Sequence, residues 1–234
     1  AAAAAAAAFR MLRLRRLRDS RPWAAVALAS DEEAAAQGSD GACGLSLGRV
    51  AVSTEEGEFV IECDFQKAPL TCGYVRQLVD RGAYSDGRAS FFRIVPSYGS
   101  GVEAATINPG VQIHVLQGGL KPDALHPIPN TIPLESTERT GLRHVKWAVS
   151  LARRERWEPY GSFFVCMEDE KELDCGGRRH PDGQGFAVFG KVVEGFDVLD
   201  RIYFTRREEG EMLQREVKFL QARFYMDNSS TSQH

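Results

Sequence analysis

The sequence lacks three features that would assign it to a specialised class of protein. Its five cysteines are an odd number and form no Cys-x-x-Cys pair, which argues against a disulfide framework and favours reduced thiols in a reducing compartment. No apolar run approaches the roughly 20 residues of a membrane-spanning helix. The formal net charge of −3 gives no general affinity for nucleic acid or for an anionic membrane. We therefore expect neither a membrane span nor a nucleic-acid partner.

What is present suffices for one globular domain with extensions. The chain has 234 residues, of which 43% are hydrophobic, enough for a single core. Shifts in composition predict a basic N-terminal extension (1–29), an acidic linker rich in small residues (30–48), a globular domain (49–226) and a polar C-terminal tail (227–234).

The N-terminal extension is rich in arginine and poor in acid. It opens with eight alanines, from which we infer no chemistry, and then carries six arginines and the single acid Asp19 between Phe9 and Pro22. Such a segment resembles an organelle transit peptide, so we expect a chloroplast or mitochondrial location, with the cytoplasm as the alternative. The competing interpretation is an arm that docks on an acidic partner or on RNA, and we expect a protein partner to order it.

The globular domain reads as many short strands with two helices. In the run 58–64, Phe59, Ile61 and Cys63 share one face of a strand. One helix is predicted from Pro69 to just before Gly82, and the other over 195–203. The remaining short apolar runs predict strands over 91–95, 111–119, 146–151, 163–167, 186–193 and 215–225. This composition favours a closed antiparallel barrel, which leaves no sheet edge exposed.

Two polar residues interrupt apolar runs. Arg93 lies in Phe-Phe-Arg-Ile-Val-Pro (91–96), and Gln117 lies in Val-Leu-Gln-Gly-Gly (115–119). A buried guanidinium or amide is costly unless something binds it. We therefore treat both as candidate functional residues.

Four motifs follow one another in a recognisable order: 91–96, the Gln-Gly-Gly of 117–119, the Ser-Phe-Phe-Val of 162–165, and the Val-Phe-Gly-Lys-Val of 188–192. Together they resemble the signature of the cyclophilins, the peptidyl-prolyl cis-trans isomerases, over roughly residues 48–226. The resemblance implies a mainly β fold, a closed eight-stranded antiparallel barrel capped by a helix at each end. The loop before the last motif is closer to the bacterial branch of the family.

The resemblance also implies rotation of X-Pro peptide bonds in proline-containing polypeptides, which assists protein folding and needs no cofactor and no metal. Arg93 would donate to the amide nitrogen, which regains a lone pair in the twisted amide, and Gln117 would hold the peptide backbone. By family position, the pocket for the proline ring would be lined by Val115, Phe164, Leu173, Phe186, His114 and Ala152.

The chain also departs from the family pattern. Phe92, His114, Ser162, Glu172 and Phe186 replace residues that are commonly His, Phe, Gln, Trp and His, and an insertion (97–110) separates Arg93 from Gln117. These changes leave open an alternative, namely a catalytically weak or inactive scaffold subunit of a large multiprotein assembly.

Other polar residues are interpreted as structural. The spacing Cys-x8-Cys-x4-His of Cys166, Cys175 and His180 matches no common zinc site, so no metal is predicted. We expect His144 to lie on the surface and Asp174 in a loop.

Overall fold

The computed structural model of this protein describes residues 47–95, 111–124, 127–128, 131–154, 157–205 and 208–226. The predicted N-terminal extension, nearly all of the acidic linker, the insertion 97–110 and the C-terminal tail lie outside the described residues.

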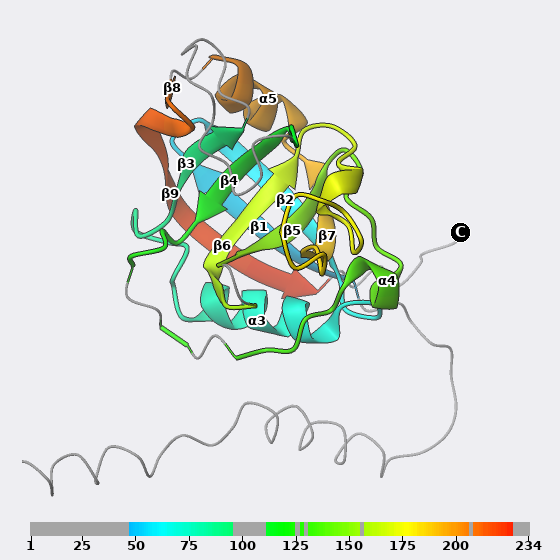
Figure 1. Cartoon of the computed structure of the whole chain (residues 1–234). Coiled ribbons are helices and arrows are strands. Elements are labelled where there is room, and N and C mark those ends of the chain that lie inside the picture. The colour runs from blue at the N-terminus through cyan, green and yellow to red at the C-terminus, as the bar shows by residue number, and fades with distance from the viewer. Residues whose placement is uncertain are drawn as a thin grey trace, which may run out of the picture. The chain divides into compact units, whose positions relative to one another are not determined.

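Eight strands close into an antiparallel barrel (Figure 1). The spatial order is β1-β2-β7-β5-β6-β4-β3-β9, and β1 also pairs with β9, which closes the sheet. A two-residue strand, β8, extends the hairpin at the start of β9. The predicted eight-stranded closed barrel is therefore confirmed. The strands are β1 (Leu47–Thr54), β2 (Gly57–Asp64), β3 (Ser90–Val95), β4 (Val115–Gly119), β5 (Ala148–Arg153), β6 (Pro159–Cys166), β7 (Ala187–Glu194), β8 (Glu208–Glu209) and β9 (Met212–Met226).

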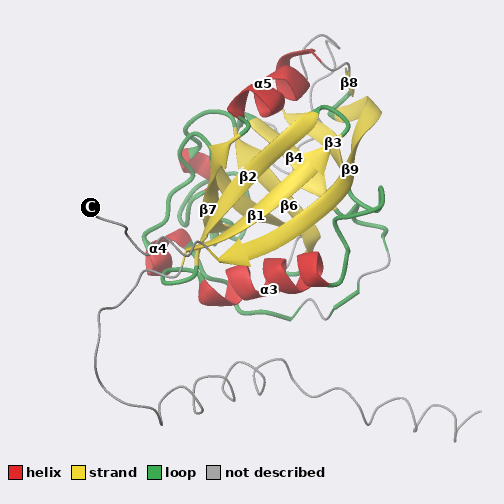
Figure 2. Ribbon diagram, turned by 180° about the vertical axis from the view of Figure 1, so that it is seen from behind, coloured by secondary structure: helices red, strands yellow, loops and turns green. Residues whose placement is uncertain are grey.

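Two helices lie at opposite ends of the barrel (Figures 1 and 2), as predicted. They are α3 (Pro69–Asp80) and α5 (Phe196–Thr205), while α4 (Thr137–Thr140) and the 3-10 turn η1 (Lys171–Leu173) lie in connections. Helix α3 starts with a proline in its first turn, where the missing N–H is not needed, and buries its apolar face against the barrel. Glu135, far along the chain, accepts hydrogen bonds from the N–H groups of Leu70 and Thr71 at 3.2 and 2.7 Å. This carboxylate caps the helix, because it satisfies first-turn N–H groups that have no partner within the helix.

Aromatic rings fill part of the barrel interior. Phe59, Phe91, Phe163, Phe219 and Tyr84 are each at most 1% exposed, and most of their contacts are edge-to-face, with centroids 5.0 to 6.4 Å apart. The Gln-Gly-Gly motif belongs to this packing. A Cβ at Gly118 would lie 2.6 Å from the Phe91 ring, so that position must be glycine.

The predicted strand 111–119 is shorter in the structure. Only β4 (Val115–Gly119) pairs with neighbouring strands, because the backbone before it bonds to a loop instead. The His114 carbonyl accepts from the Met167 N–H at 2.8 Å, and the Val111 carbonyl accepts from the Arg179 side chain at 3.1 Å. The segment before β4 thereby ties the sheet to the β6–β7 loop (residues 167–186).

We expect Phe219→Ala to lower the free energy of unfolding by about 3–5 kcal/mol, because it removes a buried ring that contacts four others. Leu220→Ala is the matched control, since Leu220 follows it on β9 and is 53% exposed. This control should change stability by no more than about 0.5 kcal/mol. Chemical denaturation measures both, and equal effects would contradict this account of the core.

Candidate active site

The strand register places three motif residues in one row across the barrel. Arg93 on β3 is opposite Gln117 on β4, and Gln117 is opposite Phe164 on β6. Side chains directly opposite each other on neighbouring strands lie on the same face of the sheet. Residues that are far apart in the sequence therefore become neighbours on the outer face of the barrel.

Gln117 is the centre of a hydrogen-bond network. Its Oε1 accepts from Arg93 Nη1 at 2.8 Å, and its Nε2 donates to the Tyr160 hydroxyl at 2.8 Å and to Ser162 Oγ at 3.1 Å. Because a guanidinium can only donate, this pairing fixes which end of the amide faces Arg93. Ser162 in turn donates to the Gly118 carbonyl at 2.9 Å, which fixes its hydroxyl. The oxygen and the nitrogen of the Gln117 amide therefore both have partners.

Glu211 holds the other side of Arg93. Arg93 Nε donates to Glu211 Oε2 at 2.7 Å, and Arg93 Nη2 pairs with the same oxygen. The Glu211 side chain is only 9% exposed. Within the described residues, three of the five N–H groups of the guanidinium are engaged in these bonds, which leaves two for a ligand. No sequence signal pointed to Glu211, because it lies outside the recognised motifs and 118 residues from Arg93.

Beside Arg93 and Gln117 lies an apolar pocket of about 100 Å³. The predicted residues Val115, Ala152, Phe164, Leu173 and Phe186 all line it, together with Ile113 and Tyr160. The rings of Phe164 and Phe186 meet edge-to-face, with centroids 5.5 Å apart. The pocket therefore combines an apolar lining with polar side chains, among them Arg93 and Gln117.

The structure does not bring His114 into this pocket. Its Nδ1 lies 2.9 Å from Glu170 Oε1, and its side chain is 35% exposed. Ile113 lines the pocket instead. The sequence could have indicated this, because side chains of an extended segment alternate between its two faces. Ile113 is four residues from Gln117 and shares its face, whereas His114 is three residues away and does not. The same period relates Tyr160, also missed, to Phe164.

Two further arginines line the pocket, Arg153 and Arg179. Arg153 is fully buried and donates to both Asp182 oxygens, at 2.7 and 2.6 Å. These hydrogen bonds hold the pKa of the Asp182 carboxyl well below its usual range. Arg153 also lies over the Phe186 ring, 5.3 Å from its centroid. It thereby fixes the β6–β7 loop, which carries Leu173 and Phe186, against the barrel.

His144 is buried behind the pocket, so the expectation of a surface position was wrong. It is 2% exposed and stacks on Phe164 with centroids 5.9 Å apart. Its Nδ1 lies 2.8 Å from Asp174 Oδ1, and its Nε2 lies 3.0 Å from Ser150 Oγ. Burial lowers the pKa of His144, although Asp174 opposes the shift. A neutral ring fits both contacts, donating to the Asp174 carboxylate and accepting from Ser150.

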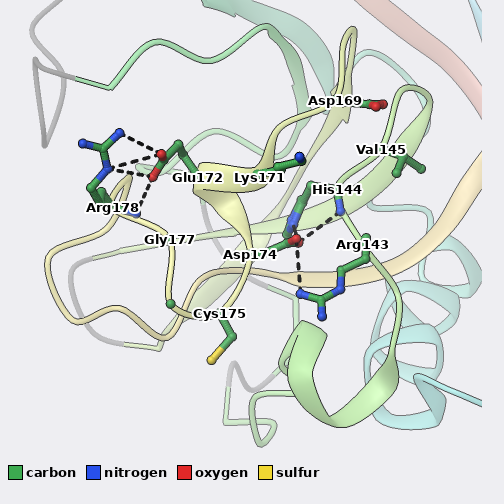
Figure 3. A pocket seen from close by; sticks show the side chains of 11 residues that line it. Arg143, His144, Val145, Asp169, Lys171, Glu172, Asp174, Cys175, Gly177 and Arg178 are labelled. Carbon is green, nitrogen blue, oxygen red and sulfur yellow. Dashed lines mark hydrogen bonds and ion pairs between the residues drawn. The ribbon is translucent and has the colours of Figure 1, made fainter.

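Asp174 also borders a second, wider hollow of about 630 Å³ (Figure 3). Its charged side chains form pairs: Arg178 with Glu172 at 2.8 Å, and Arg143 with Asp174 at 3.4 Å. Glu172, which stands at the common Trp position of the family, lines this hollow together with Asp174. Within the described residues, no group of three or more His, Cys, Asp or Glu side chains is arranged to hold a metal ion. None of the described helices is both long and apolar enough to cross a membrane.

Comparison with known proteins finds one family over this region. The family described as "Cyclophilin type peptidyl-prolyl cis-trans isomerase/CLD" matches residues 49–223. A peptidyl-prolyl cis-trans isomerase A of Dickeya dadantii is 30% identical over 68% of this chain and 73% of its own length. A chloroplastic peptidyl-prolyl cis-trans isomerase of Arabidopsis thaliana is 31% identical over 61% of this chain, but over only 30% of its own length. A Cryptosporidium parvum cyclophilin-type isomerase, solved in the presence of the dipeptide Ala-Pro, matches 76% of this chain and 98% of its own with a TM-score of 0.56 and 15% identity.

The burial of neutral His144 predicts a stability that falls on acidification. Because the folded-state pKa lies below the ordinary 6.5, the unfolded chain takes up a proton first as the pH falls, and the unfolded state is favoured. We expect the free energy of unfolding to decrease from pH 7 to pH 5, and less so in His144→Gln than in the wild type. Denaturant titrations at several pH values measure how the free energy of unfolding of each protein changes with pH. An equal decrease in the wild type and in His144→Gln would contradict the prediction. Asp174, whose pKa is also lowered, loses its contribution only at more acidic pH.

Proposed function

The chain belongs to the cyclophilin-type peptidyl-prolyl cis-trans isomerase family, and we propose that the pocket beside Arg93 is where it rotates X-Pro peptide bonds. The observation that carries the proposal is the row of Arg93, Gln117 and Phe164, which sets a guanidinium beside an apolar pocket of about 100 Å³. The apolar side chains of the pocket contact the proline ring, and Arg93 and Gln117 face the peptide bond that precedes it.

Catalysis in this site is selective binding of a twisted amide. The uncatalysed barrier is about 18–20 kcal/mol, because rotation removes the resonance of the peptide bond. A site that binds the twisted form more tightly than either planar form lowers this barrier. Two N–H groups of Arg93 have no partner in the described part of the chain, and they suit that task, since the twisted nitrogen carries a lone pair that can accept a hydrogen bond. No nucleophile, proton carrier or cofactor takes part in this scheme.

Gln117 and Glu211 position the guanidinium. Gln117 accepts from one end of it and Glu211 from the other, so rotation of the guanidinium about its own bonds is restricted before substrate binds. Orientation of this kind lowers a barrier, because little reorganisation remains when the reaction occurs. Tyr160 and Ser162 hold Gln117 in place.

We expect Arg93→Ala to lower kcat/KM for isomerisation of an X-Pro peptide by about 10²–10³, the usual effect of removing one well-placed electrostatic donor. Arg93→Lys keeps the charge but not the planar fork that reaches both Glu211 and Gln117, and should recover only a small part of the rate. A protease-coupled or NMR exchange assay measures the rates. Wild-type-like rates in Arg93→Ala would overturn the assignment.

A second function, a scaffold subunit with weak or no activity, is favoured by one observation. The Glu211 carboxylate compensates the charge of Arg93 and thereby reduces the positive potential that a substrate would meet. If the wild-type protein binds proline peptides in a titration, yet does not isomerise them, the scaffold interpretation replaces the catalytic one. Recovery of activity in Glu211→Gln would then identify the compensating charge as the cause.

We infer that the protein works in an organelle and that its N-terminal arm meets a protein partner in an assembly. The arginine-rich, acid-poor composition between Phe9 and Pro22 supports this, as does the chloroplastic relative. Residues 1–48 fused to a fluorescent protein should direct it to a chloroplast or mitochondrion. A fusion with the six arginines replaced by glutamine should stay in the cytoplasm, and cytoplasmic fluorescence from both would contradict the inference.

A further inference from the structure

Three guanidinium groups line the proline pocket, and they differ in their counter-charges. Arg93 is paired with Glu211, and Arg153 with Asp182. Arg179 lines the same pocket, and within the described part of the chain it has no carboxylate partner. It is therefore the uncompensated cation of this pocket.

Arg179 is held in place by neutral groups. Its Nη1 donates to the Val111 carbonyl at 3.1 Å, and its backbone N–H donates to the Glu172 carbonyl at 3.0 Å. The residue is 5% exposed. Both contacts orient the side chain from the β6–β7 loop toward the pocket, and neither cancels its charge.

The remaining donors of Arg179 retain access to open space. Among the described residues, the buried side-chain nitrogens and oxygens without a hydrogen-bond partner are Arg49 Nε, His180 Nε2 and Glu211 Oε1. Nε and Nη2 of Arg179 are not in that set, although they have no acceptor in the described part of the chain. Since the residue is otherwise buried and lines the pocket, these donors face the pocket volume.

The carboxylates closest to Arg179 in electrostatic terms each have another partner. The two carboxylates that act on Arg179, Glu211 and Glu170, are engaged with Arg93 and His114 respectively. Burial first, and then the charge of Arg93, lower the pKa of Arg179, and an arginine remains charged even so. A nearly buried cation of this kind is costly unless an anion accompanies it.

We propose that Arg179 determines substrate specificity, by binding the carboxylate of an aspartate or glutamate that flanks the proline in the pocket. The inference rests on the proposed isomerase site. The apolar side chains of the pocket contact the ring, so the carboxylate comes from a neighbouring residue of the polypeptide. The Nε–H and Nη2–H groups of a guanidinium can bind the two oxygens of a carboxylate through strong, charge-assisted hydrogen bonds.

The test compares peptides that differ only beside the proline. One series carries Glu, Gln or Lys immediately before it, and a second series carries them immediately after it. For the full-length protein we expect kcat/KM to be about tenfold higher for Glu than for Gln at one of the two positions, and lowest for Lys. The size corresponds to one hydrogen bond between charged groups. The preference should shrink as salt is added.

Variants of Arg179 then test whether this residue causes the preference for Glu over Gln. Arg179→Gln should remove the Glu-over-Gln ratio. Because both peptides are compared on the same variant, any change in the basal rate cancels from this ratio. Arg179→Lys, which keeps the charge without the fork, should retain a reduced ratio. The matched control is Arg178→Gln: Arg178 is adjacent in sequence but exposed, and it is paired with Glu172 (Figure 3). This control should keep the full ratio.

Several outcomes would overturn the proposal. Equal rates for the Glu and Gln peptides, or a ratio that persists in Arg179→Gln, would remove Arg179 from substrate recognition. A preference confined to peptides that end in a free proline carboxylate would assign the contact to a chain terminus instead. Failure of the proposed function is recognised separately, since the rate for the Gln peptide reports on isomerisation itself. Thermal unfolding confirms that each variant is folded.

Discussion

The register of β3, β4 and β6 is the constraint on which the rest of this molecule depends. A slip of one residue on β4 would move Gln117 to the barrel interior and bring Leu116 to the outer face, because successive side chains of a strand alternate in direction. Interior packing prevents such a slip, since the Phe91 ring occupies the space above Gly118. The aromatic core therefore positions the outer face, where the row of Arg93, Gln117 and Phe164 lies.

The contacts of Arg93 with Glu211 and Gln117 have two opposed effects. Glu211 and Gln117 fix the guanidinium, which favours catalysis through orientation, while the Glu211 charge reduces the field offered to a ligand. Arg179, from the β6–β7 loop, lines the same pocket, and its charge is the one that we propose to bind an acidic residue of the substrate.

The β6–β7 loop supplies three side chains of the site. It carries Leu173, Arg179 and Phe186, and two buried polar contacts fix it: Arg153 with Asp182, and His144 with Asp174. A loop that has little regular structure can hold side chains this well only when its polar groups are satisfied internally.

The sequence by itself determined the short strands, the two helices and the expectation of a closed barrel, because alternation, helical spacing and turn residues are local patterns. The number of strands, the capping at each end and most of the pocket were implied by the resemblance of the motifs around Arg93, Gln117 and Phe164 to the cyclophilins. Only the tertiary structure decided that Glu211 meets Arg93, that His144 is buried against Asp174, that Ile113 and not His114 lines the pocket, and that Arg179 lines it without a carboxylate partner among the described residues. These contacts join segments that lie far apart in the chain, so their partners are set by how the barrel closes, which no periodicity in the sequence encodes.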